Sequence, residues 1–324
     1  MLTNELTIIN IFFQIDEFCK VFIPVWNKYL IDNNKKHYKS RVDTLSESEL
    51  ITIEILYQLS GYKNFKEFYN NTLYFILKSY FPNIPSYKRL ISLKYKIMVP
   101  LLFYLQYNKG KETGIYYIDS TSLPVCKNQR INNHKTFKDL ANRGKTSMGW
   151  FYGFKLHLII NNKKEIMNIK ITKGNVFDNK VIDDLAKNLK GKLFGDRGYL
   201  SKKEKLKELE KKEIILITKS RKNMKIKQED NLSEEDKTLL SKRNIIETVI
   251  GEIKRLTNIC TTRIKNVYNY FVNILSSVCA YQLKYMWKAG LGLVNKIPSY
   301  FTERYPIGTM GYLNIFTSFM FNLF

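Results

Sequence analysis

Three acidic residues in distinctive local settings constrain the fold of this chain more than any other feature. Asp119 ends the apolar run Ile-Tyr-Tyr-Ile, and Asp196 follows Leu-Phe-Gly at the end of a second short run. Glu247 lies instead in a segment whose apolar residues have helical spacing. Carboxylates at two strand ends and on one helix can converge on one point, so we expect a sheet edge with a helix beside it.

A strong excess of basic residues indicates the kind of partner. Lys and Arg number 53 against 29 Asp and Glu, which gives a formal net charge of +24. A surface of this charge favours the backbone of double-stranded DNA as partner, with a generic basic surface as the alternative. No RNA-binding motif of the Arg-Gly-Phe kind is present, so RNA is the weaker candidate.

Cysteine usage and hydropathy indicate the compartment. The four Cys residues form no Cys-x-x-Cys pair, and the three His residues have no zinc-finger spacing. The amino terminus lacks a signal-peptide pattern, and no run of about 18 apolar residues occurs. We therefore expect a cytoplasmic protein without a membrane span, associated with the nucleoid when it is bound to DNA.

The first third of the chain has helical spacing. Residues 6–29 predict one long helix, and Ser46 with Glu49 predicts a capping box at the start of another. A further helix opens near residue 86, and its basic face would be formed by Lys88, Arg89, Lys94 and Lys96. That face suits either DNA docking or plain solvation. We assign residues 1–112 to a helical N-terminal DNA-binding domain.

Beyond Thr113 the pattern predicts alternating strands and helices. The expected order is strand 115–119, strand 154–160, strand 165–172, helix 180–190, strand 192–195, helix 202–212, strand 213–218, a polar loop 219–238, and helices 241–257 and 265–288. This is the order of a ribonuclease H-like α/β fold, in which a mixed sheet with flanking helices presents acids from its first and fourth strands to a glutamate on a later helix. We assign residues 113–288 to this catalytic domain, and 289–324 to a C-terminal tail of unknown role.

The chemistry that suits such a site is two-metal phosphoryl transfer. Carboxylate oxygens are hard ligands, which favour Mg²⁺ or Mn²⁺. Two ions roughly 3.5–4 Å apart can clamp the attacking and the leaving oxygen of an in-line displacement. We therefore expect Asp119, Asp196 and Glu247 to be the catalytic ligands of two ions.

Two glutamates of the predicted helix 241–257 compete for the third ligand position. At about 100° per residue, Arg243, Glu247 and Lys254 fall together on one edge of an apolar stripe. Glu252 falls on the opposite edge. Spacing alone leaves two interpretations of Glu247 open, a metal ligand or an ordinary i, i+4 ion pair with Arg243.

The spacing Arg243, three residues, Glu247, six residues, Lys254 resembles the signature of the catalytic glutamate in bacterial DDE-type insertion-sequence transposases, most closely the insertion-sequence 982 family. Four further segments in the same order resemble that family, namely Tyr117–Ser120, Gly153–His157, Thr172–Asp178 and Gly195–Tyr199. The resemblance covers roughly residues 45 to 287. One departure is Leu240, where the broader signature has a Tyr.

The resemblance implies cleavage at the ends of a mobile element, followed by joining of the freed 3′ hydroxyl to target DNA. Asp119, Asp196 and Glu247 would hold the metal ions, and Arg243 and Lys254 would contact phosphates at the scissile end. The N-terminal domain would bind the terminal inverted repeats, within a homodimer that pairs two ends.

Several neighbouring residues have a weaker claim on DNA or on the site. We expect phosphate or DNA contacts from Arg197, Lys155, Lys219, Arg221 and Lys222, the last three within a uniformly basic stretch. For Lys155 and His157 a structural role is the favoured alternative. Asp178 precedes a predicted helix, so an N-cap role is favoured over approach to the site.

Two other functions remain compatible with these patterns. A catalytically inactive or repurposed transposase-derived DNA-binding protein would keep the fold, although the presence of all three carboxylates argues against loss of the site. A stand-alone nuclease of the ribonuclease H fold would not need a DNA-binding domain of the predicted size.

Overall fold

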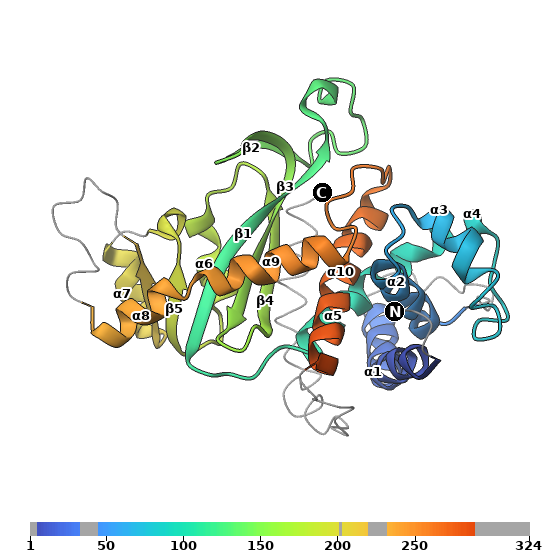
Figure 1. The fold of residues 1–324 in the computed structure, drawn as a ribbon, viewed down its shortest axis with the longest axis horizontal. Helices are drawn as coiled ribbons and strands as arrows, with labels where there is room; N and C mark the ends of the chain where they lie inside the picture. The colour runs from blue at the N-terminus through green and yellow to red at the C-terminus, as the bar shows by residue number, and fades with distance from the viewer. Residues whose placement is uncertain (1–4, 33–44, 201–202, 220–231, 289–324) are drawn as a thin grey trace.

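The computed structural model describes residues 5–32, 45–200, 203–219 and 232–288 (Figure 1). A mixed sheet with flanking helices lies beside a helical N-terminal region, which confirms the predicted ribonuclease H-like class. Within these ranges, no helix is long and apolar enough to cross a membrane.

The sheet has six strands, which are β1 (Ile115–Cys126), β2 (Asn142–Thr146), β3 (Gly149–Asn161), β4 (Ile166–Lys173), β5 (Gly191–Gly195) and β6 (Ile214–Thr218). Their order is β2-β3-β1-β5-β6, and β4 also pairs with β3. The pairs among β1 to β4 are antiparallel, whereas β5 runs parallel to both β1 and β6. The carboxyl ends of β5 and β6 therefore point the same way as β1.

Helices surround this sheet and form the N-terminal region. They are α1 (Glu5–Asp32), α2 (Glu47–Leu59), α3 (Phe65–Phe68), α4 (Tyr87–Leu93), α5 (Met98–Tyr107), α6 (Ile182–Leu185), α7 (Lys203–Lys211), α8 (Glu234–Ser241), α9 (Asn244–Leu256) and α10 (Val267–Lys288). Shorter 3₁₀ turns include Asp178–Val181 and Arg197–Tyr199. The predicted capping box of α2 is confirmed, because the Ser46 hydroxyl accepts from the Glu49 N–H at 3.2 Å and the Glu49 carboxylate accepts from the Ser46 N–H at 2.7 Å.

Each face of the sheet has its own hydrophobic core. Tyr117 of β1 and Phe194 of β5 belong to the core that continues into the N-terminal helices. Tyr116, Ile118 and Leu193 point the other way, into a smaller core with residues of α6 and α7. Because alternate residues of a strand share a face, this division decides where the acidic residues point.

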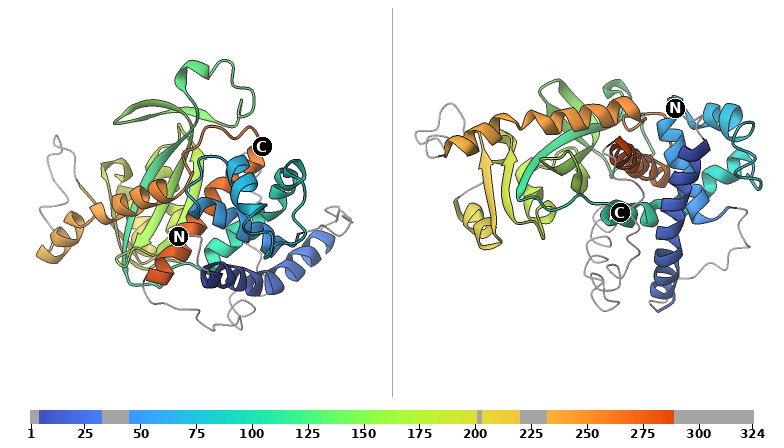
Figure 2. Two further views of the ribbon diagram at one scale, coloured as in Figure 1. Left: turned by 45° about the vertical axis from the view of Figure 1, so that its right-hand side comes forward. Right: turned by 60° about the horizontal axis from the view of Figure 1, so that its bottom comes forward.

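Helix α10 joins the two regions of the molecule. It lies between the sheet and the N-terminal helices in two views (Figures 1 and 2). On α2, the buried Gln58 amide donates to the Asn273 side chain of α10 at 2.9 Å, and its oxygen accepts from the Asn258 N–H at 3.0 Å. The N-terminal helices are therefore packed on the sheet region through a common core, and the domain boundary at 112/113 stays a prediction.

Four elements differ from the prediction. Strand β2 was not expected, and β1 continues to Cys126 instead of ending at Asp119. The helix expected over 180–190 is only a 3₁₀ turn followed by the single turn of α6. Helix α8 begins at Glu234, inside the expected loop 219–238.

The basic face expected on the helix after residue 86 also needs correction. Lys94 is buried and forms an ion pair with the buried Glu54 of α2. Its ammonium also lies over the Phe65 ring. Neither DNA docking nor solvation describes Lys94, because the charge is held inside the N-terminal core by its partner.

Candidate active site

Asp119 and Asp196 are brought together by the parallel pairing of β1 and β5. Ile118 pairs with Gly195, and Tyr117 with Phe194, so each aspartate is the next residue after a paired position. The rings of Tyr117 and Phe194 are 5.7 Å apart on the face that α9 and α10 cover. Because Asp119 and Asp196 each stand two residues beyond one of these rings, both lie toward this face, Asp119 within β1 and Asp196 directly after β5.

Glu247 approaches the same face on α9. This helix packs against β1 through its apolar stripe, of which Ile246, Val249 and Ile253 are fully buried. The Glu247 side chain is 53% exposed, and Arg243 Nη2 donates to its Oε1 at 3.1 Å. The i, i+4 ion pair that spacing left open is therefore present.

Glu252 lies on the other side of α9. Burial raises the pKa of Tyr281 on α10, and the negative charge of Glu252 raises it further. The same carboxylate also contributes to the raised pKa of Tyr285. Glu252 thus lies near the end of α10, whereas Glu247 lies near enough to Asp119 for its charge to raise the pKa of that aspartate.

The pKa of Asp119 reflects its burial and the charges around it. Burial raises its pKa from 3.8 to about 6, and the charges of Asp196 and Glu247 raise it as well. The Ser120 N–H, which donates to the Asp119 carboxylate at 2.8 Å, and Arg243 act in the opposite direction. Burial of the carboxyl is therefore the main cause of its raised pKa, and the two other acids are close enough to add to it.

The donor chemistry of this cluster fits divalent ions, although the ligands do not converge as they stand. Three carboxylates are the hard oxygen ligands that Mg²⁺ and Mn²⁺ prefer. In the described part of the chain, no three His, Cys, Asp or Glu side chains are arranged to hold one ion. The Glu247 side chain would have to turn from Arg243 toward the aspartates, so the ligand assignment stays a prediction.

The residues expected to contact phosphates differ in how exposed their side chains are. Arg243 is only 11% exposed, and its Nε is buried without a hydrogen-bond partner. Lys254 is exposed on α9, where its charge opposes the effect of burial on the pKa of Cys260. Arg197 is exposed in the turn after Asp196, and Lys219 is half-buried directly after β6. Arg221 and Lys222 lie outside the described residues.

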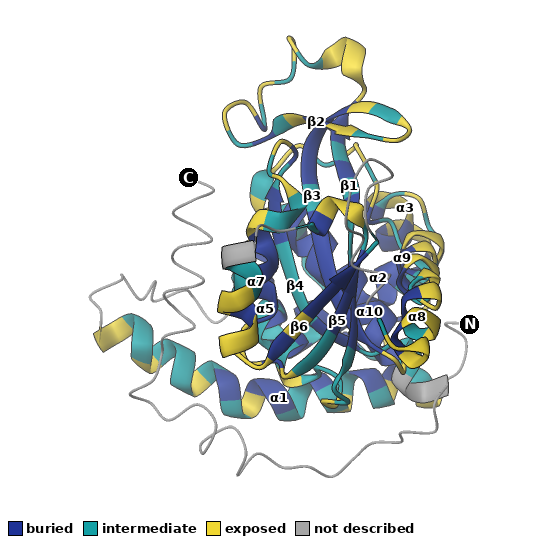
Figure 3. Ribbon diagram, turned by 90° about the vertical axis from the view of Figure 1, so that its left-hand side faces the viewer, coloured by how far each residue is buried: buried dark blue, intermediate teal, exposed yellow. Residues whose placement is uncertain are grey.

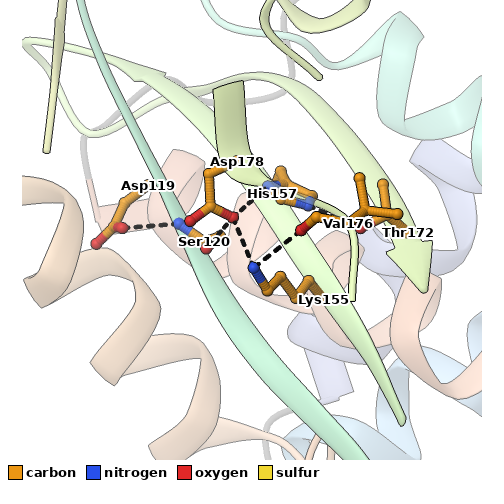
Figure 4. Close-up of polar contacts among 7 residues, drawn as sticks. All are labelled: Asp119, Ser120, Lys155, His157, Thr172, Val176 and Asp178. Carbon is orange, nitrogen blue, oxygen red and sulfur yellow. Dashed lines mark hydrogen bonds and ion pairs between the residues drawn. The ribbon is translucent and has the colours of Figure 1, made fainter. Parts of the chain in front are cut away.

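Behind β1, on the face opposite Asp119, a polar network surrounds Asp178 (Figure 4). Its Oδ1 accepts from the Ser120 hydroxyl at 3.2 Å and from Lys155 Nζ at 3.0 Å. Lys155 also donates to the Val176 carbonyl at 3.0 Å. The predicted N-cap role of Asp178 is wrong, because its carboxylate bonds to these side chains and makes no capping bond. The DNA contact expected for Lys155 stays a prediction, but its burial and partners favour the structural alternative.

His157 completes this network without carrying charge. Its ring is fully buried, Nε2 lies 2.9 Å from the Thr172 hydroxyl, and Nδ1 lies 3.8 Å from Asp178. Burial lowers its pKa to about 4, so the imidazole is neutral at physiological pH. This agrees with the structural role favoured for His157.

The Asp178 network contacts residues that adjoin Asp119 and Asp196, on the opposite face of the sheet. Ser120 directly follows Asp119, and Gly198 lies two residues after Asp196. A Cβ on Gly198 would stand 3.1 Å from Asp178 Oδ2, so the glycine lets the turn approach this carboxylate. Sequence reasoning did not find this role, although the segment Gly-Asn-Val-Phe-Asp at 174–178 was a signal for it.

Comparison with known proteins agrees with this geometry. Residues 109–267 match the family model described as "Transposase DDE domain". No curated protein and no solved structure matches the chain. The matched range runs from the approach to β1 to the start of α10, and it contains both aspartates and Glu247. Residues 109–267 are therefore similar to transposase DDE domains.

Proposed function

We propose that this chain is a DNA transposase that cleaves the ends of an insertion sequence and joins the freed 3′ hydroxyl to target DNA. The observation that carries the proposal is the pairing of β1 with β5, which sets Asp119 beside Asp196 on the face where α9 presents Glu247. The motif resemblance supports an element of the insertion-sequence 982 family.

In this proposal, Asp119, Asp196 and Glu247 hold two Mg²⁺ or Mn²⁺ ions. When bound, such ions activate the attacking oxygen and stabilise the leaving oxygen of a phosphodiester. The half-exposed Glu247 side chain is free to rotate toward the aspartates, whereas Asp119 is fixed by the Ser120 N–H. Rotation of Glu247 would leave Arg243 unpaired, with its charge available to a phosphate.

The remaining parts of the chain have roles in holding DNA. Lys254 and Arg197 are exposed and would contact phosphates near the scissile bond. The helical N-terminal region would bind terminal inverted repeats, within a homodimer that pairs two ends. Lys219, Arg221 and Lys222 would add contacts to the backbone.

The test is metal-dependent cleavage of a labelled duplex that carries the DNA flanking the gene. We expect nicking at the repeat boundary in Mg²⁺ or Mn²⁺, lost in Glu247→Gln and kept in the matched variant Glu252→Gln. Loss in Glu252→Gln with retention in Glu247→Gln would contradict the site assignment. Tight binding without cleavage by the wild-type protein would instead indicate an inactive or repurposed DNA-binding protein.

A further inference from the structure

The chain between β1 and β3 forms a projection that the proposed catalytic chemistry does not use. We define residues 127–150 as the β2 arm, which contains a 3₁₀ turn at Asn128–Arg130 and strand β2. The arm extends beyond the body of the sheet, and much of its surface is exposed (Figures 1 and 3). Strand β2 is paired only with the first residues of β3.

The base of the arm is firmly anchored. Phe137 is fully buried, with its ring centroid 4.9 Å from that of Tyr270 on α10 and 5.9 Å from that of Phe154 on β3. The Tyr152 hydroxyl donates to the Phe137 carbonyl at 3.1 Å. These contacts fix the direction in which the arm leaves the protein.

The exposed surface of the arm is strongly cationic. Six basic residues of the arm are all exposed, namely Lys127, Arg130, Lys135, Lys138, Arg143 and Lys145. Asp139 is the one acidic residue in residues 127–150. A mixed-charge surface, as on α7, is the usual pattern of a solvated face, so this excess of positive charge points to an anionic partner.

The tip of the arm adds two exposed apolar side chains to this charge. Met148 is 98% exposed in the turn between β2 and β3, and Trp150 is 60% exposed at the start of β3. Lys145, the cross-strand partner of Trp150, has its ammonium 5.7 Å from the indole centroid. The turn is ordered, because the Thr146 hydroxyl bonds to the Gly149 carbonyl and the Asn128 amide bonds to the Trp150 carbonyl.

We propose that the β2 arm binds double-stranded DNA, with its cations on phosphates and Met148 and Trp150 packed against the groove. This inference rests on the proposed function, which supplies the duplex. A two-stranded ribbon fits the major groove, where apolar side chains can contact the methyl groups of thymines. An acidic protein would satisfy the cations, but it would give no reason for the apolar tip to stand beyond them.

The arm contacts the duplex at a distance from the scissile phosphate. From Asp119 to Cys126, β1 advances seven residues, which corresponds to roughly 23 Å at the usual rise of a strand. That length equals about seven base pairs of B-form DNA. A duplex that runs along β1 would therefore meet the arm about this far from the cleavage position.

The test measures binding of full-length protein to the labelled flanking duplex over a range of salt concentrations, without divalent metal. Arg143→Gln with Lys145→Gln should reduce the slope of log affinity against log salt by about 2, since each lost phosphate contact removes about 0.9. The matched control is Lys207→Gln with Lys211→Gln, which removes two charges from the mixed-charge helix α7. An equal reduction in both double variants would overturn the proposal.

The apolar tip is tested separately. Met148→Ser and Trp150→Ala should each weaken duplex binding at least tenfold and leave the salt slope unchanged. Addition of duplex should also quench the fluorescence of Trp150, which is identified as the signal that Trp150→Phe removes. If the wild-type protein binds the duplex and no arm variant changes that binding, the proposal for the β2 arm is wrong and the proposed function is unaffected. Absence of wild-type binding to the flanking duplex would count against both. Altered self-association with unchanged DNA binding would make the arm a protein interface, contrary to the proposal.

Discussion

Asp119 is the residue whose ionisation should affect stability most clearly. Its pKa is about 6 in the folded protein, above the ordinary value of 3.8, so the folded state binds the proton more tightly than the unfolded state. The stability that this proton provides is complete below about pH 4 and is lost as pH rises through about 6. The metal-free protein is therefore destabilised at pH 7 by up to about 3 kcal/mol.

This predicts that Asp119→Asn stabilises the metal-free protein at pH 7 and has little effect at pH 4. The measurement is urea unfolding at both pH values in a chelator. Asp184→Asn is the control, because this exposed carboxylate pairs only with Lys170 at the surface. A stability difference for Asp119→Asn that does not vary with pH would show that burial of the charge is not its cause.

For single residues, the sequence indicated the candidate acids but not the environment of the lysine side chains. Helical spacing separated Glu247 from Glu252, because a wheel depends only on local geometry. It could not distinguish Lys94 from Lys88, because the burial of Lys94 depends on Glu54, forty positions earlier in the chain. A charge partner at such a separation is decided by tertiary packing.

Between elements, the Asp178 network connects the turn 178–181 to β1, β3 and the turn after β5. We predict that Asp178→Asn weakens Mn²⁺ binding and strand cleavage about tenfold or more, the usual cost of removing a residue that orients metal ligands. The reason is that the Ser120 and Lys155 bonds lose their charged acceptor. Mn²⁺ affinity is measured by calorimetry, independently of cleavage.

Asp184→Asn again provides the comparison, since it removes a nearby carboxylate that contacts neither strand end. Wild-type Mn²⁺ affinity in Asp178→Asn would mean that the network serves folding alone. Restored affinity in Asp178→Glu, measured beside it, would indicate that the carboxylate itself is required.

Element boundaries were predicted best where one face of the element is buried. Strands β3 to β6 and helices α9 and α10 begin and end within a few residues of expectation, because their apolar pattern reflects a packed face. Strand β2 has the sequence Asn-Arg-Gly-Lys-Thr, which carries no apolar pattern, and it exists because β3 offers an edge. The helix expected at 180–190 ends early, since Ala186 is the C-cap of α6 and Asn188 has a positive φ of 66°, which an α-helix cannot contain.

For the whole molecule, the shared core predicts that the catalytic part does not fold alone. Every residue from Phe271 to Leu283 of α10 is buried, and α10 packs on α2 and α5 as well as facing the sheet region. A fragment of residues 113–288 would expose this apolar surface and the amides that Gln58 satisfies. We expect it to aggregate or to lack cooperative unfolding in calorimetry.

The full-length protein, heated under the same conditions, is the reference for that experiment. A sharp, reversible transition of the fragment at a similar temperature would establish an independent domain at 113–288. The sequence placed this boundary at the change of apolar period, which marks where one kind of element gives way to another. Such a change does not indicate which surfaces of the helical region and the sheet region pack against each other.

Asp178 lies on the face of the sheet opposite Asp119, which bears on how the proposed site could evolve. Asp119 and Ser120 are neighbours in sequence but point to opposite faces of one strand, so the Asp178 network contacts β1 from the face opposite the proposed ion site. In the proposed site, substitutions around the turn at 178–181 would therefore alter the position of Asp119 while every proposed ligand is retained. Adaptation to an ion of different radius would then not require any change among the proposed ligands.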